Sequence, residues 1–146
     1  FICLIFWFCH SIIFIFLFNM AKVIRYSIKN ETHTGENNFL IHRPFIFSNP
    51  FTHIKDKNTK AKYVVSSREE AIDLYKDYFD TMLMTSPKFK EEWDKMYEAY
   101  KTFDEIYIGC YCSATEPCHG DVIIEKLKRR SIKEMMEQIK QKRQGT

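Results

Sequence analysis

The feature that most constrains the fold is a short apolar segment that leads directly into a helix. Residues Ile106 to Tyr111 are apolar and bounded by polar residues, which is typical of a buried strand. The residues from Ser113 to Pro117 predict a loop, and a helix is expected from about Cys118 onward. A strand that runs into a helix through a short loop is the arrangement that places ligands at the carboxyl end of a strand.

Two further strands are predicted near the start of the chain. Residues Ala21 to Ile28 are rich in β-branched and aromatic side chains and predict a first strand. Residues Phe39 to His42 predict a second, short one. The next segment, Arg43 to Phe51, contains two prolines, so we expect a shaped loop there rather than a central strand.

Two helices are predicted in the middle of the chain. Ser67 stands three residues before Glu70, the spacing of a capping box. A second helix start follows at Ser86-Pro87, with proline at the first helical position. Apolar residues at helical spacing follow both starts and predict core-facing stripes. We therefore expect a single small α/β domain, three-layer-like, with a short mixed or parallel sheet packed by about three helices.

Residues 1–18 contain no Asp, Glu, Lys or Arg. Three interpretations are open: a segment translated from non-coding DNA ahead of Met20, a transmembrane anchor, or a buried strand. We favour translation from non-coding DNA, because Met20 is directly followed by a well-patterned strand. This interpretation predicts that the protein does not contact a membrane. The expected boundaries are 1–19 for this segment, 20–128 for the α/β domain and 129–146 for a basic helical tail.

The cysteines predict a reducing compartment. Cys3 and Cys9 fall in the uncharged segment, which leaves Cys110, Cys112 and Cys118 close together. A disulfide framework would need an even number of cysteines spread along the chain. Three clustered thiols favour a reduced, cytoplasmic protein.

These thiols belong to the densest cluster of chemically capable residues. Cys118 and His119 stand at a predicted helix start, where free N–H groups and the helix dipole attract anions and lower a thiol's pKa. Cys110 and Cys112 share one face of a strand. Four interpretations are open: a ligand pocket, a reactive thiol, a zinc site, or structural cysteines. The spacing is unlike common structural zinc sites, so we assign no metal and keep Cys112, Cys118 and His119 as the zinc candidates, with Cys110 as a further possible ligand.

Other basic residues suggest possible partners. Arg43 precedes a turn at Asn49-Pro50, and its guanidinium suits phosphate or carboxylate. The tail from Lys126 to Arg143 is rich in Lys and Arg, which predicts a solvated helix face, with nucleic-acid contact as the alternative. The net charge of +3 does not by itself argue for nucleic acid.

Together these segments resemble a bacterial and phage family catalogued as domain of unknown function 4326. The resemblance covers about Val23 to Leu127 and includes the Cys-His-Gly-Asp motif at 118–121. It rests on Arg43, Ser48–Phe51, Ser67–Ala71, Gly109–Cys112 and Cys118–Asp121. Ser48 stands where the family commonly has Gly, and Tyr111 where it commonly has Trp. The resemblance implies a compact α/β domain, in the host cytoplasm if phage-encoded, and brings no activity.

The leading hypothesis is a nucleotide-related protein that binds a phosphate-bearing small molecule and can act on it. Cys118 would be the thiolate, His119 the acid or base, and Asp121 would orient His119 or cap the helix. The predicted ligand-binding residues are Arg43, Asn49, Cys110, Cys112 and Gly120. The alternative is a non-enzymatic module, structural or stabilised by zinc, that binds protein or nucleic acid. Whether the protein is an enzyme is left open by the sequence, and no cofactor is assigned.

Overall fold

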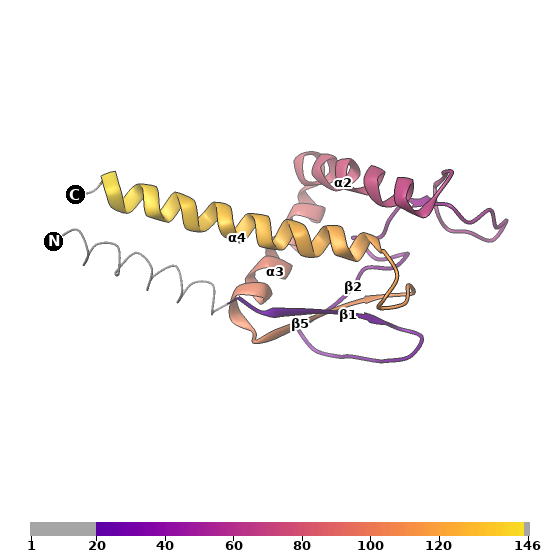
Figure 1. Ribbon diagram of the computed structural model, residues 1–146, viewed down its shortest axis with the longest axis horizontal. Helices are drawn as coiled ribbons and strands as arrows, with labels where there is room; N and C mark the ends of the chain where they lie inside the picture. Colours follow the sequence, from indigo (N-terminus) through magenta and orange to yellow (C-terminus); the bar gives the residue numbers. More distant parts are fainter. Residues whose placement is uncertain (1–19, 145–146) are drawn as a thin grey trace.

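The computed structural model describes residues 20–144, and in this part of the chain three helices accompany two small sheets. The helices are α2 (Arg68–Thr85), α3 (Pro87–Thr102) and α4 (His119–Gln144). Figure 1 shows them on one side of the main sheet. The predicted single α/β domain is confirmed. The interpretations of residues 1–19, with Cys3 and Cys9, lie outside the described residues.

The main sheet is fully parallel. Strand β5 (Glu105–Cys110) lies in the centre, between β1 (Lys22–Ser27) and β2 (Asn38–Leu40). Both neighbours run parallel to β5, so the carboxyl ends of all three strands meet at one edge. A second parallel pair consists of β3 (Phe51–Thr52) and β4 (Tyr63–Val64).

The two faces of the main sheet are covered differently. On one face, Ile106 and Ile108 of β5 are fully buried in the core that the helices share. On the other face, the ring of His33 stacks on Tyr107 with ring centroids 4.0 Å apart. The loop between β1 and β2 therefore covers the face that the helices leave open.

Gly109 in β5 is required by the close approach of its neighbours. A Cβ atom at this position would lie 2.6 Å from the Tyr26 hydroxyl and 2.9 Å from a methyl group of Leu40. Tyr26 lies across the central strand, and its hydroxyl donates a hydrogen bond to the Asn38 side chain at 2.9 Å. Only glycine leaves room for this bridge between β1 and β2.

The helices begin where the sequence predicts. Ser67 caps α2 by accepting a hydrogen bond from the Glu70 N–H, and Ser86 caps α3 in the same way. Their apolar faces meet in an aromatic cluster around Phe79, whose ring packs against Phe89 and Trp93. Helix α4 starts one residue later than predicted and continues without a break past residue 129.

Among residues 20–144, none of the helices has the length and apolar character needed to cross a membrane.

Candidate functional site

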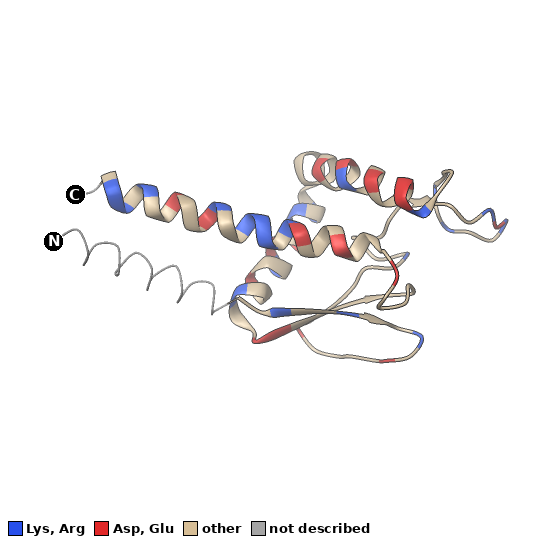
Figure 2. Cartoon of the chain, in the orientation of Figure 1, with Lys and Arg blue, Asp and Glu red and all other residues tan. Residues whose placement is uncertain are grey.

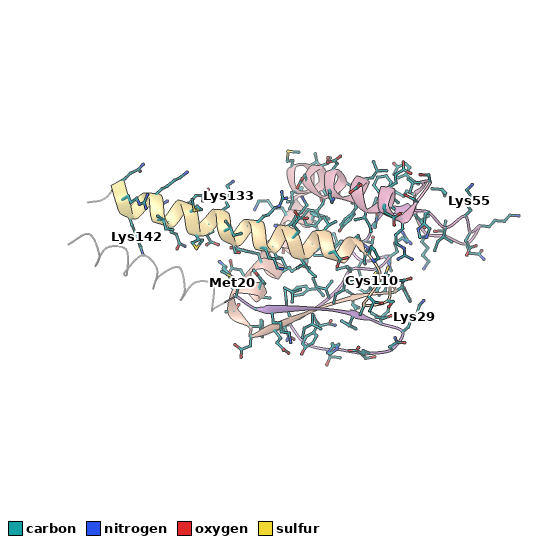
Figure 3. The ribbon with its side chains drawn as sticks, viewed as in Figure 1. Met20, Lys29, Lys55, Cys110, Lys133 and Lys142 are labelled. Atoms are coloured by element: carbon teal, nitrogen blue, oxygen red, sulfur yellow. The ribbon has the colours of Figure 1, made fainter. Side chains whose placement is uncertain are left out.

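A cavity of about 500 Å³ opens at the edge where the parallel strands end. Its wall comes from the segments that follow β1, β2 and β5, from the start of α2, and from the β3 region with the loop after it. Cys110 and Lys29 lie at this end of the sheet in Figure 3. The position agrees with the expectation that ligands bind beyond the carboxyl ends of parallel strands.

The cavity brings together most of the predicted site residues. Six of them line it: Arg43, Asn49, Cys110, Cys112, Cys118 and His119. Gly120 and Asp121 are not among its lining residues. The two segments that were singled out separately in the sequence, Arg43 with Asn49 and the cysteine region, are thus walls of one cavity.

Three cysteine sulfurs form a compact cluster in the cavity wall. The Sγ atoms of Cys110, Cys112 and Cys118 all lie within 4.8 Å of one another. Cys110 ends β5 and Cys118 immediately precedes α4, and both are buried, whereas Cys112 is half-buried. This set of donors could hold a metal ion. It contains Cys110, the further possible ligand of the predicted zinc set, and it does not contain His119.

The pKa values of the three thiols shift in different directions, and only that of Cys112 is lowered. Hydrogen bonds from the Cys110 and Cys118 thiols lower the pKa of Cys112, as does the nearby Arg68 guanidinium, whose Nη1 lies 3.9 Å from the Cys112 Sγ. The hydrogen bond between Cys110 and Cys118, followed by that with Cys112, raises the pKa of Cys118. These directions favour a thiolate at Cys112 over the predicted one at Cys118.

His119 is buried, and both of its ring nitrogens have partners in the protein. Nε2 lies 2.9 Å from the Ile41 carbonyl oxygen, and Nδ1 lies 3.6 Å from the Cys118 Sγ. Since a carbonyl can only accept, Nε2 carries the hydrogen and donates it. Burial lowers the pKa of His119, which favours the neutral form of the ring. This arrangement fixes the ring in the cavity wall and disfavours the predicted acid–base role.

Asp121 caps α4. Its Oδ2 accepts a hydrogen bond from the Cys118 backbone N–H at 2.9 Å, and the Gly120 N–H points to the Cys118 Sγ at 3.4 Å. The motif at residues 118–121 thus resembles a capping box in which Cys118 takes the place of serine, Asp121 the place of glutamate, and the cap side chain accepts from the Gly120 N–H. Of the two roles considered for Asp121, helix capping is the one seen; the His119 ring is held by Ile41 instead.

Arg25 is the residue in this region that the sequence did not single out. Its Nε lies 3.1 Å from the Asp121 Oδ1, and its other nitrogens donate to three backbone carbonyls in the loop before α4. Its side chain is only 9% exposed. Arginine in the middle of an apolar strand was the available signal, but such a residue equally suits a solvent-facing position.

Gly120 allows this arrangement to pack. A Cβ atom there would lie 2.8 Å from the Arg25 Cδ and 3.0 Å from the Ile41 Cδ1. Its role is therefore close packing of β1 and the segment after β2 against the start of α4, in place of the predicted ligand contact.

Arg43 and Asn49 also form part of the cavity wall. The Arg43 Nη1 donates to the Asn49 carbonyl oxygen at 2.7 Å. The Asn49 side chain donates to the Ala71 carbonyl and accepts from the Phe51 N–H. The polar atoms of the Asn49 side chain therefore bind the protein backbone. The donors of Arg43 other than Nη1 stay available to the cavity.

The cavity wall is strongly basic. Four cations line it, Lys29, Arg43, Lys60 and Arg68, against a single carboxylate, Glu116. Glu116 pairs with Arg68 at 3.7 Å. Between residues 20 and 144, no carboxylate lies within ion-pair distance of Lys29 or Lys60. Lys29 and Lys60 are not among the predicted site residues, because they lie in polar loops that show no pattern of their own.

These features define a small α/β protein with a basic, cysteine-lined cavity at the carboxyl edge of a parallel sheet. The chain belongs to the family described as Domain of unknown function (DUF4326), whose match covers residues 24–129. That span includes every residue of the cavity wall. Neither the curated proteins nor the solved structures contain a match to this chain.

Proposed function

We propose that the protein binds a phosphate-bearing small molecule, of about the size of a nucleotide, in the cavity at the carboxyl edge of the sheet. The observation that carries the proposal is the excess of cations in the cavity wall. The wall contains four basic side chains and one carboxylate, and that carboxylate is paired with Arg68. A cavity of about 500 Å³ lies within the range of small-molecule sites.

The phosphate groups are expected near Lys29 and Lys60, which both line the cavity. The backbone N–H groups of Cys118 and Gly120 at the start of α4 already donate within the capping box. The sequence had suggested that N–H groups at this helix start bind an anion, but these two already have partners within the protein. Lys29 and Lys60 lack carboxylate partners among the described residues, and binding a phosphate would supply the missing negative charge.

Aromatic rings near the cavity mouth support a ligand with a planar group. Tyr111 is 54% exposed and lines the cavity, and its ring meets that of His42 edge-on at 4.7 Å. Phe51 also lines the cavity and stacks on Tyr63 with ring centroids 5.4 Å apart. Exposed aromatic faces of this kind suit stacking with a nucleobase.

The small-molecule proposal is preferred over nucleic-acid binding through the tail, because α4 carries both signs of charge (Figure 2). Several of its cations are already paired: Lys126 with Asp80 at 2.6 Å, and Arg130 with Asp94 at 2.8 Å. Pairing within the fold reduces the charge available to a phosphate backbone.

A thermal-shift screen of the full chain tests the proposal. The probes are ADP, ATP, NAD, ADP-ribose and pyrophosphate, with adenosine as the uncharged comparison. A ligand at about a hundredfold excess over its Kd stabilises the folded state by about 2.7 kcal/mol, an easily measured shift. We expect a shift with phosphate-bearing probes and none with adenosine.

A matched pair of variants locates the binding. Lys60→Ala removes a cavity cation, whereas Lys57→Ala removes a cation from the same loop that does not line the cavity. The shift should shrink in the first variant and persist in the second. Equal shifts in both variants, or no shift with any phosphate-bearing probe, would overturn the proposal.

A further inference from the structure

Core packing alone does not explain why the three cysteine sulfurs lie so close together. A buried cysteine that only packs behaves as a small apolar side chain among other apolar groups. Here the three sulfurs lie against one another, and their nearest polar neighbours include the Arg68 guanidinium and the His119 ring. The three also come from different places in the fold: the end of β5, the bend after it, and the cap of α4.

We infer that Cys110, Cys112 and Cys118 bind a thiophilic divalent metal ion such as Zn²⁺ as three thiolate ligands, with the fourth coordination position facing the cavity. Tetrahedral zinc with Zn–S distances of about 2.3 Å places its sulfur ligands about 3.8 Å apart. The observed sulfurs all lie within 4.8 Å of one another. Each sulfur atom therefore has to move by less than about 1 Å, through a side-chain rotation, to reach the distances of a zinc site.

The surroundings of the sulfurs match what metal-bound thiolates need. The Cys118 Sγ accepts the Gly120 N–H at 3.4 Å, and the Arg68 guanidinium faces the Cys112 Sγ at 3.9 Å. Three thiolates around a divalent ion leave one net negative charge. Arg68 and the positive end of α4 offset that charge, and outer N–H donors of this kind orient thiolate ligands.

The fourth position is assigned to the cavity because all three cysteines line it. His119 is the nearest nitrogen donor, with Nδ1 3.6 Å from the Cys118 Sγ, but its atoms lie outside the three-sulfur set. A water molecule or an anionic ligand in the cavity would complete the coordination. The metal site goes beyond the proposed ligand binding, and its occupancy can be measured without any phosphate-bearing probe.

Metal content of the full chain tests this inference directly. The protein is purified with a phosphine reductant, loaded with Zn²⁺ and separated from unbound metal. Its metal content is then measured by inductively coupled plasma mass spectrometry. We expect about one Zn²⁺ per chain. Titration with Co²⁺ should give a near-ultraviolet thiolate-to-cobalt charge-transfer band that saturates at the same ratio.

Cysteine variants assign the ligands. Cys112→Ser should abolish tight Zn²⁺ binding and the cobalt band, and its half-buried position allows the variant to fold, which circular dichroism checks. The matched control is Cys3→Ser with Cys9→Ser, which removes the other two thiols of the chain and should leave both signals intact. His119→Ala should also retain the metal.

Three results would overturn the inference. The first is a wild-type protein that binds no more metal than the Cys112→Ser variant. The second is loss of the metal in the control that lacks Cys3 and Cys9. The third, loss of the metal in His119→Ala with the fold preserved, would contradict the open fourth position. None of these depends on the nucleotide screen, so failure of one proposal leaves the other intact.

Discussion

The Arg25 Nε lies 3.1 Å from the Asp121 Oδ1 and joins the edge strand β1 to the first turn of α4. The same guanidinium donates to the carbonyl oxygens of Ser113, Ala114 and Glu116. One nearly buried cation thus fixes both the loop before α4 and the carboxylate that caps this helix. Because Cys118 and His119 stand at the cap, Arg25 is a positioning residue for the cysteine side of the cavity.

Replacing Arg25 with Gln should lower the free energy of unfolding by about 3 kcal/mol, since it leaves backbone carbonyls and a capping carboxylate without their charged donor. Urea denaturation measures the loss. The comparison is Arg129→Gln, which removes an exposed partner of Glu125 and should change stability by less than about 1 kcal/mol. Similar losses in the two variants would contradict the role given to Arg25.

Gly109→Ala should destabilise the protein by about 1–3 kcal/mol, because the added methyl group must displace the Tyr26 ring or the Leu40 side chain. The shift in the urea midpoint gives the change. A variant as stable as the wild type would mean that the bridge between Tyr26 and Asn38 is not a constraint on this position.

Asp94 should make stability depend on pH in acid. A hydrogen bond from Lys90, together with one from Arg130, lowers the pKa of Asp94 below its usual value of 3.8. A lowered folded-state pKa stabilises the protein above the unfolded-state pKa, and this contribution is lost as the pH falls through the folded-state pKa. Asp94→Asn should therefore reduce the free energy of unfolding at neutral pH, by less than about 1 kcal/mol at this largely exposed pair.

The same variant should match the wild type in strong acid, where Asp94 is protonated. Urea denaturation at the two pH values, with Glu137→Gln as a comparison on the outer part of α4, measures the difference. A gap between wild type and Asp94→Asn that is the same at both pH values would contradict the assignment.

Much of the fold could be predicted from local patterns. The capping serine Ser67, the Ser86-Pro87 helix start and the apolar run from Ile106 are short-range signals, and the structure confirms the elements that they predict. The pair β3 and β4 could not be predicted. Each strand has two residues, and such strands depend on partners distant in the sequence rather than on a pattern of their own.

The sequence predicts which residues come together more accurately than it predicts the contacts that each of them makes. The cysteines and His119 do line a cavity at a strand-to-helix junction. The roles of Asp121, Gly120 and the Cys118 thiol depend on Arg25 and on the other sulfurs, which approach only in three dimensions. Spacing along the chain indicates that the three thiols are near one another, but it does not show how the sulfurs are arranged or which of them lies beside Arg68.

The most direct test of the anion-binding cavity is to map where a small phosphate compound binds, by recording amide NMR spectra of the labelled full chain during titration with pyrophosphate and then ADP. The account predicts saturable shifts around Lys29, Lys60, Arg68 and Tyr111, with the aromatic residues shifting further with ADP. Shifts confined to the outer half of α4, or changes that grow without saturation over the whole surface, would contradict it.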